Sequence, residues 1–388
     1  MVRNKLIVVQ YVNSSVGKFG NVGFRSGKVI EALNSLGIAN YHISRGFEDE
    51  FQSNAITKGR YWLISRSMTF LKSYVFKSFR SRLYDDLIFR FLHLNFSFKK
   101  VLKISDKYKK KILLMWSYDP KIISKYKKQG FQIFLDIQIA PAKFSEELFK
   151  NGYLNFLPKI DSYIKLEKEA LKHADKILSP SIFVTEILQE LYLVNKERIS
   201  TINFGVEQLK SRRKKLFQNK NKIRFCFLGN LTERKGISFL IEAWKAASIE
   251  NAELHICGRF TRELKSLLNK KDLKSVYFPG FVNSFDYLQE SDIYVFPSLF
   301  EGSSKSVFEA MACGLPIITT PNSGSVVTHN KEGIIVPIGE IDKLAKAMIK
   351  LASNLDLRLQ MGEQSMRTSK EYTWKKYGEK VTDALLED

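Results

Sequence analysis

The sequence contains little that would indicate a disulfide-stabilised or membrane-spanning protein. It has only three cysteines in 388 residues, and none of them forms a paired spacing such as Cys-x-x-Cys. We therefore expect small buried thiols in a reducing compartment. No apolar run approaches the roughly 18 to 20 residues that span a bilayer, and the first apolar run is too short for a signal peptide. These absences predict a cytoplasmic protein, either soluble or peripheral on the inner face of the plasma membrane.

Acidic residues are scarce relative to basic ones, 40 against 62, which gives a net charge of +22. The excess lies in two segments. Residues 60–128 contain 18 Lys and Arg but four Asp and Glu, and residues 208–224 contain eight Lys and Arg and no acid. Such patches predict an anionic partner, which the charge alone leaves open among nucleic acid, phospholipid and phosphate.

Apolar residues in the first basic segment recur every four positions, as on one face of a helix. They are Leu71, Val75, Phe79, Leu83 and Leu87. Two interpretations stay open: a helix packed on its own sheet with a solvated cationic side, or a surface helix that binds anionic lipid. Interleaved aromatic and basic residues also suit single-stranded nucleic acid, so a nucleic-acid-binding protein is a rival class.

Short apolar runs alternate with helical patterns in both halves of the chain. Examples are residues 5–11 and 131–137 in the first half and 223–230 and 292–298 in the second. This rhythm predicts the α/β class, with two parallel sheets. Ligands bind at the carboxyl ends of strands in such sheets, so two facing domains would form a cleft there.

Two carboxylates, Glu301 and Glu309, stand eight residues apart around the small residues 302–304. We expect a helix to begin after the small residues, where unpaired N–H groups and the helix dipole favour an anion. A ligand with a central diphosphate and hydroxyl groups on both sides would fit between the carboxylates. A second interpretation of Glu309 stays open, in which it forms a capping box with Ser306 and only closes the helix start.

Arg234 and Lys235 follow another strand-like run and a glycine turn, at the start of the next helix. Cations oppose the helix dipole at that position. We expect an anion between them and the amides, such as a diphosphate leaving group. A solvated basic turn is the alternative interpretation.

These motifs resemble the C-terminal domain of family 4 retaining glycosyltransferases (glycosyl transferases group 1), which have the GT-B fold. The resemblance rests on "FLGNLTERKG", "PSLFEGSSKSVFEAMACGLPIITT" and "GIIVP". It implies two Rossmann-like domains that face each other across a cleft. The acceptor-binding domain would span residues 1–207 and the nucleotide-sugar-binding domain residues 208–370, with a helix over residues 371–388 that crosses back to the first domain.

The resemblance also implies residue roles. Glu301 would hold hydroxyls of the transferred sugar, Glu309 would bind the ribose, and Lys235 with Arg234 would bind and stabilise the phosphates. The other expected donor-binding residues are Gly229, Asn230, Gly302, Ser303, Ser304 and Lys305. A glycine loop in the first domain would give the donor or acceptor room near the reaction centre, and it comprises Gly17, Lys18, Phe19 and Gly20.

Two positions depart from the family's pattern. Asn230 stands where an arginine often follows the strand-end glycine, and Arg234 is expected to compensate. The histidine common at a strand end of the first domain is absent, and Asp136 and Gln138 stand in the corresponding place. Asp136 would accept the proton of the acceptor hydroxyl if it lay within hydrogen-bond reach, although a loop-capping role is also open.

No metal ion or other cofactor is expected. The five histidines are scattered without metal-binding spacing, and the sequence has no Asp-x-Asp motif, the usual divalent-cation site of the other large transferase fold. A metal-independent reaction is therefore predicted.

The resemblance predicts a retaining glycosyltransferase that moves a sugar from a nucleotide-sugar donor to a hydroxyl of a lipid-linked glycan. The expected pathway is bacterial envelope polysaccharide synthesis, such as that of lipopolysaccharide or capsule. The expected partners are the donor, the glycan acceptor and an anionic membrane surface, without nucleic acid. A nucleotide-sugar epimerase of similar fold and a nucleic-acid or anionic-surface binding protein are the alternatives.

Overall fold

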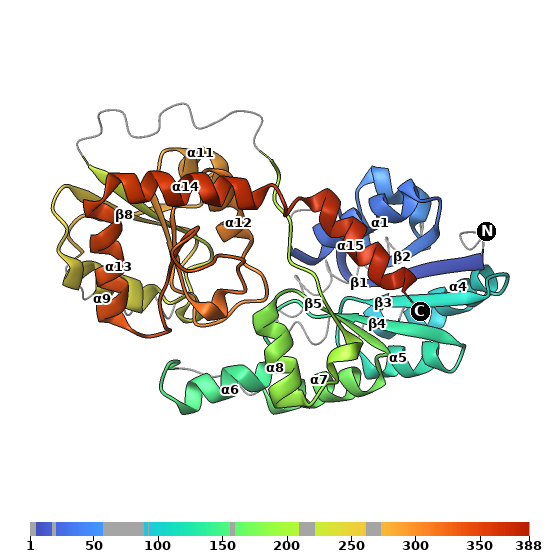
Figure 1. Ribbon diagram of the computed structural model, residues 1–388. Helices are drawn as coiled ribbons and strands as arrows, with labels where there is room; N and C mark the ends of the chain where they lie inside the picture. The colour runs from blue at the N-terminus through green and yellow to red at the C-terminus, as the bar shows by residue number, and fades with distance from the viewer. Residues whose placement is uncertain are drawn as a thin grey trace, which may run out of the picture.

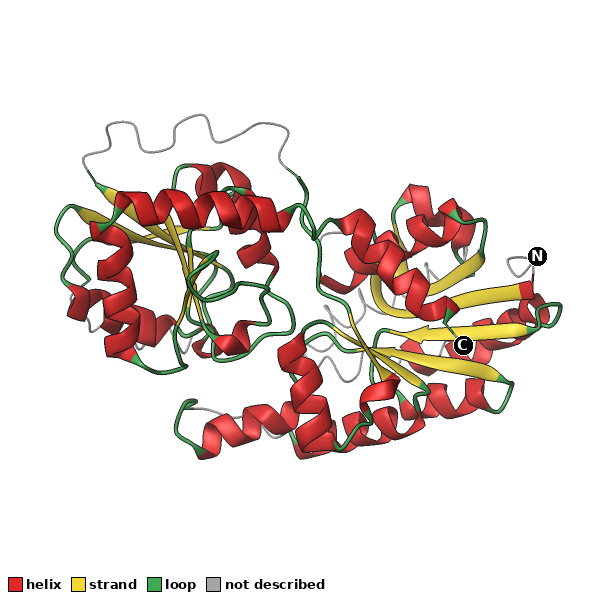
Figure 2. Cartoon of the chain, in the orientation of Figure 1, coloured by secondary structure: helices red, strands yellow, loops and turns green. Residues whose placement is uncertain are grey.

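The computed structural model describes residues 5–17, 21–56, 89–91, 93–155, 160–208, 222–260 and 273–387. The predicted basic helix over residues 71–87, most of the basic segment 208–224, and Lys18, Phe19 and Gly20 lie outside the described residues. What is described forms two domains, each built on a six-stranded sheet (Figure 1, Figure 2).

The first domain has a parallel sheet in the order β2-β1-β3-β4-β5-β6. Its central strands are buried on both faces, which explains why they are continuous apolar runs rather than alternating ones. The strands are β1 (Leu6–Val16), β2 (Ala39–Phe47), β3 (Lys110–Met115), β4 (Phe131–Asp136), β5 (Lys176–Ser179) and β6 (Ile199–Thr201). The helices are α1 (Asn21–Ser35), α4 (Phe98–Ser105), α5 (Pro120–Lys127), α6 (Ala142–Lys150), α7 (Asp161–His173) and α8 (Ile182–Tyr192).

The second domain has a parallel sheet in the order β12-β11-β10-β7-β8-β9. The prediction of two parallel α/β sheets is confirmed. The strands are β7 (Ile223–Leu228), β8 (Ala252–Cys257), β9 (Val276–Gly280), β10 (Ile293–Phe296), β11 (Ile317–Thr319) and β12 (Gly333–Ile335). The helices are α9 (Ile237–Ala247), α11 (Ser284–Gln289), α12 (Lys305–Ala312), α13 (Ile341–Ser353) and α14 (Leu355–Ser369).

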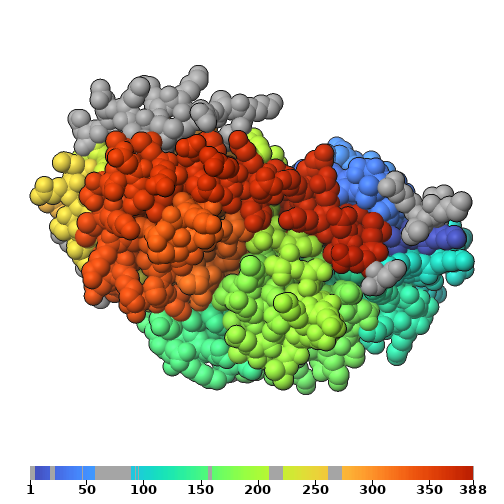
Figure 3. All heavy atoms as spheres, in the orientation of Figure 1, coloured from blue at the N-terminus to red at the C-terminus, as the bar shows by residue number. Residues whose placement is uncertain are grey.

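The chain returns to the first domain after α14. Helix α15 (Trp374–Leu386) packs on α1, where the Trp374 and Phe24 rings meet edge to face at 5.0 Å. Gly378 permits this close approach, because a Cβ there would lie 2.6 Å from the backbone oxygen of Lys28. Figure 1 shows α15 beside α1, and the space-filling view shows the last segment lying across both domains (Figure 3).

The loops after the carboxyl ends of both sheets touch each other. A Cβ on Gly302, after β10, would lie 2.2 Å from the backbone oxygen of Gln138, after β4. A Cβ on Gly324, after β11, would lie 3.0 Å from the hydroxyl of Ser181, after β5. The packing is also apolar, since Leu299 and Phe300 of the second domain belong to a hydrophobic cluster of the first. The fold therefore brings the loops with the predicted site residues to the domain interface.

The three cysteines, Cys226, Cys257 and Cys313, are buried in the second domain, as predicted. None of the described helices combines the length and apolarity needed to cross a bilayer.

Candidate functional site

The loop between β10 and α12 is held in place by hydrogen bonds to two neighbouring turns. The backbone N–H of Leu299 donates to the backbone oxygen of Arg234 at 2.9 Å. The backbone N–H of Glu301 donates to the oxygen of Asn322 at 2.9 Å, and the Asn322 amide returns a bond to the oxygen of Leu299 at 2.9 Å. This bonding fixes the path of the loop that carries Glu301.

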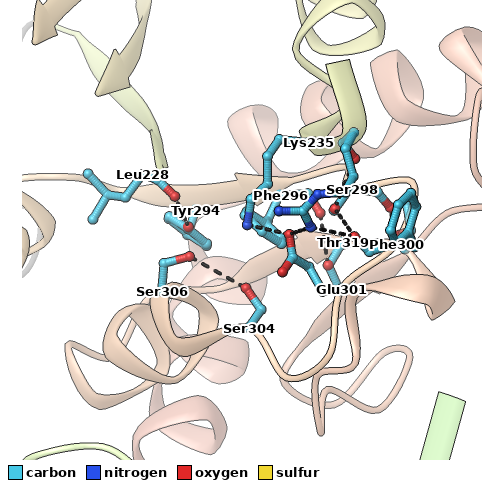
Figure 4. Close-up of polar contacts among 12 residues, drawn as sticks. Leu228, Lys235, Tyr294, Phe296, Ser298, Phe300, Glu301, Ser304, Ser306 and Thr319 are labelled. Atoms are coloured by element: carbon cyan, nitrogen blue, oxygen red, sulfur yellow. Dashed lines mark hydrogen bonds and ion pairs between the residues drawn. The ribbon is translucent and has the colours of Figure 1, made fainter. Parts of the chain in front are cut away.

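Glu301, Arg234 and Lys235 form one charged cluster (Figure 4). Both cations contact the same carboxylate oxygen, Oε1 of Glu301, and Arg234 also donates to the backbone oxygen of Phe300 at 2.9 Å. The side chains of Glu301 and Lys235 are only 11% and 13% exposed. The cluster holds two positive charges and one negative, so it carries one surplus positive charge.

Burial lowers the pKa of Lys235, and the neighbouring Arg234 lowers it further, while Glu301 raises it. This is the expected result when a charged amine leaves water beside a like charge and a single carboxylate compensates. A second anion near Lys235 would therefore favour its charged form. The aromatic rings of Phe296 and Phe300 line the cations, with the Lys235 Nζ 4.7 Å from the Phe296 ring centre.

Helix α12 begins at Lys305, directly after the small residues, as predicted. Its N-cap is Ser304, and no side chain within the described ranges caps that end. The Ser303 hydroxyl accepts a bond from the backbone N–H of Phe204, in the first domain, at 3.3 Å. The start of α12 thus lies at the interface, with a dipole and backbone amides that favour an anion.

The capping-box interpretation of Glu309 is wrong. Because α12 begins at Lys305, Ser306 lies inside the helix and Glu309 is its fifth residue. Glu309 is 6% exposed and pairs with Lys305 Nζ at 3.2 Å, one turn earlier. Lys305 is itself 55% exposed, and its amine lies 5.9 Å from the centre of the Phe24 ring of α1.

The turn after β7 carries the other predicted donor residues. Asn230 is exposed, and Gly229 adopts a φ of 153° that side chains rarely adopt. The backbone is crowded there, since a Cβ on Gly258 would lie 1.7 Å from the oxygen of Gly229. Packing therefore requires glycine at Gly258, whereas the backbone conformation favours glycine at Gly229.

Asp136 has a role that neither interpretation of the sequence included. Its carboxylate accepts two bonds from Arg25, at 2.8 and 2.9 Å, and both side chains are buried. The loop-capping interpretation is wrong. Burial raises the pKa of Asp136 and the positive charge of Arg25 opposes that rise. To act as a base, Asp136 would have to leave Arg25.

Gln138 lies at the domain interface. Its side-chain amide donates to the backbone oxygen of Trp116 at 2.5 Å, and its own backbone oxygen lies against Gly302. Gly17, by contrast, faces residues of its own domain. It has a φ of 86°, and a Cβ there would lie 2.7 Å from the Phe51 ring and 2.8 Å from the Glu48 carboxylate.

Several interface residues were missed by the sequence reasoning. Arg25 is one, and its signal is a position on the apolar stripe of α1, where Val29 and Leu33 follow at four-residue spacing. Another is Asn155, after α6, whose backbone N–H and amide both bond Glu233, next to Arg234. The sequence carries no local signal for that contact.

In the described part of the chain, no three or more His, Cys, Asp or Glu side chains are grouped as metal ligands. The Arg234–Lys235 turn carries a surplus positive charge, and the start of α12 has a helix dipole that favours an anion. Glu301 pairs with the cations of the turn, and Glu309 lies inside α12.

Comparison with known proteins finds a likeness in the second domain. Residues 222–354 match the model of the family described as glycosyl transferases group 1. This match lies within the second domain and shows a likeness to that family. It contains all the predicted donor-binding residues.

The uncharacterized glycosyltransferase MJ1069 of Methanocaldococcus jannaschii is 31% identical over 248 residues, which are 60% of this chain and 62% of that protein. The matches span about three fifths of the length of the first three curated relatives.

Two solved structures illustrate the likeness of the whole fold. WaaG, a glycosyltransferase involved in lipopolysaccharide biosynthesis, is 14% identical and superposes with a TM-score of 0.68 over 97% of this chain and 99% of its own. Anabaena Alr3699/HepE in complex with UDP is 14% identical, with a TM-score of 0.66 over 98% and 99%. The predicted GT-B fold is confirmed.

Proposed function

We propose that this protein is a retaining glycosyltransferase that transfers a sugar from a nucleotide-sugar donor to a hydroxyl of a lipid-linked glycan. The observation that carries the proposal is the sharing of one Glu301 oxygen by Arg234 and Lys235. A surplus cation beside the uncapped start of α12 suits a diphosphate, and Glu301 and Glu309 suit hydroxyl groups on its two sides. The likeness to group 1 glycosyl transferases and the UDP bound by the similar HepE structure support this choice of ligand.

In the proposed reaction, Arg234 and Lys235 exchange their ion pairs with Glu301 for ion pairs with the donor diphosphate. The released carboxylate then accepts hydrogen bonds from the sugar, while Glu309 accepts bonds from the ribose. The bond from the anomeric carbon to the phosphate oxygen breaks, and the bond to the acceptor oxygen forms on the same face. The acceptor proton passes to the departing phosphate oxygen, and the cations stabilise the diphosphate that leaves.

The acceptor and the cellular location are proposed on other grounds. The structurally similar WaaG is involved in lipopolysaccharide biosynthesis, which supports an envelope polysaccharide as the product. The positive charge of residues 60–128 supports a peripheral position on an anionic membrane surface, with the protein in the cytoplasm. Asp136 is assigned no proton-transfer step, since both its oxygens pair with Arg25.

A thermal-shift panel of nucleotide sugars, UDP, GDP and a single-stranded oligonucleotide tests the proposal. We expect a nucleotide sugar to raise the melting temperature most. A shift with the oligonucleotide alone would favour a nucleic-acid-binding protein instead. Free nucleotide released from the bound sugar nucleotide would indicate transfer or hydrolysis, whereas an isomerised sugar nucleotide would indicate an epimerase.

Lys235→Ala should then reduce turnover by a factor on the order of 10², because it removes a preorganised cation from the leaving group. The exposed Lys245 of α9 provides the matched control, since Lys245→Ala removes the same charge away from the cluster. Equal rates in both variants would contradict the proposed phosphate site.

A further inference from the structure

Arg25 is among the most buried charged residues of the protein, with 1% of its surface exposed. Its guanidinium donates to both Asp136 oxygens and, at 3.2 Å, to the hydroxyl of Tyr377 in α15. It also lies 4.9 Å from the ring centre of Trp116 and 4.4 Å from that of Phe204. One side chain thus joins segments of the chain that are far apart in sequence.

Three of these partners are connected to the loop that precedes α12, either by their own contacts or through Gln138. Asp136 is two residues before Gln138, whose backbone oxygen lies against Gly302. Trp116 accepts the bond from the Gln138 amide through its backbone oxygen. The Phe204 N–H donates to the hydroxyl of Ser303. The parts of the first domain that touch residues 302–303 therefore share Arg25 as a common neighbour.

Stability alone is a weak explanation for this arrangement. Removing two charges from water costs several kcal/mol per ion, and well-packed apolar residues often stabilise a core as much. Arg25 also leaves its Nε without a hydrogen-bond partner in the described part of the structure. A planar, bidentate guanidinium does, however, fix the direction of its partners more strictly than apolar contact does.

We propose that Arg25 is a positioning residue. It holds Gln138 and Phe204 of the first domain against Gly302 and Ser303, in the loop between β10 and α12. This inference rests on the proposed transfer reaction for its purpose. Its structural content is independent of that reaction: without the bidentate fork, the two domains would no longer meet in one defined arrangement.

The distance between the domains tests the proposal directly. Nitroxide labels on Lys99→Cys in α4 and Lys245→Cys in α9 would report it by double electron–electron resonance, since both lysines are exposed while the native cysteines are buried. In Arg25→Lys, which keeps the charge but loses the fork, we expect the distance distribution to broaden about twofold, as for domains free to move. Turnover of the nucleotide sugar with the largest thermal shift should fall about tenfold or more. The Kd for UDP should stay within about twofold, because the UDP site lies in the other domain.

Arg358→Lys is the matched control. Arg358 is also buried, but it lies in α14 and donates to backbone oxygens of Leu351 and Ala352, within its own domain. Its substitution should lower the melting temperature without broadening the distribution. A distribution in Arg25→Lys that stays as narrow as in the wild type, or broadens no more than in Arg358→Lys, would overturn the proposal.

Tyr377→Phe provides a second variant in case Arg25→Lys does not fold. It removes the hydroxyl that accepts a hydrogen bond from Arg25, and it should broaden the distance distribution less than Arg25→Lys does. An unchanged width in a folded Tyr377→Phe would overturn the proposal when Arg25→Lys is unfolded. If the wild type turns over no nucleotide sugar, the proposed function fails, and the distances still decide the role of Arg25.

Discussion

Glu301→Gln keeps the shape of the side chain and removes its charge. In the free protein, the change leaves Arg234 and Lys235 next to each other without their shared carboxylate. Hydrogen bonds to charged groups contribute about 1.5–3 kcal/mol each, so the variant should be less stable than the wild type. It also loses the one group that raises the pKa of Lys235 against burial and Arg234.

A diphosphate should relieve this loss. In the wild type the phosphates must displace Glu301 from two cations, whereas in Glu301→Gln the cations have no such competitor. A gain of about 1.4 kcal/mol, close to the strength of one charged hydrogen bond, corresponds to about tenfold tighter binding of UDP. Turnover should fall by a factor on the order of 10², since the sugar loses its carboxylate.

Isothermal titration with UDP, beside a turnover assay, measures both effects. Glu309→Gln is the comparison, because the loss of the ribose partner should weaken UDP binding rather than strengthen it. If Glu301→Gln instead binds UDP about tenfold more weakly than the wild type, Glu301 supports the nucleotide, and the proposed division between Glu301 and Glu309 is refuted.

Three further predictions concern the interface, the pH dependence and the absence of a metal. Gly302→Ala places a Cβ 2.2 Å from the Gln138 oxygen, so turnover should fall by about 10² with the Kd for UDP nearly unchanged; wild-type turnover would show that the loops need not meet. Glu167, which accepts bonds from Ala142 N–H and the Tyr192 hydroxyl, has its pKa raised by burial from 4.5 to about 7. The pKa of Glu167 is higher in the folded protein than in the unfolded chain, so the stability that the protonated carboxyl contributes is lost as the pH rises from 4.5 to about 7. The loss is about 3 kcal/mol, at 1.36 kcal/mol per pKa unit. In denaturant unfolding, the free energy of unfolding of Glu167→Gln should therefore rise relative to that of the wild type over this pH range. A difference in free energy of unfolding that stays constant with pH would argue against the raised pKa. A chelator such as EDTA should leave turnover intact, and complete loss of activity would contradict metal independence.

The sequence predicted the parts of the site that local patterns determine. The strand before Glu301, the small residues after it and the helix start at Lys305 are all local features, with known dipole and turn preferences. The pairing of Arg234 and Lys235 with Glu301 was not predicted as such, although both motifs were identified. Their contact depends on the order of β7 and β10 in the sheet.

The first-domain side of the site was predicted less well, for a physical reason. Asp136 and Arg25 are 111 residues apart, and no periodicity in either segment specifies the partner. Burial decides their roles, since a carboxylate at a strand end can equally face solvent, cap a loop or pair with a distant cation. The same holds for Gly302, which the sequence linked to a phosphate and the structure places against Gln138.

A crystal structure of the protein with UDP tests the central claim most directly. We predict the diphosphate between the side chains of Arg234 and Lys235 and the amides at Ser303 and Ser304, with the ribose at Glu309. A UDP molecule bound away from residues 229–236 and 301–309, with Glu301 still paired to both cations, would contradict the proposed site.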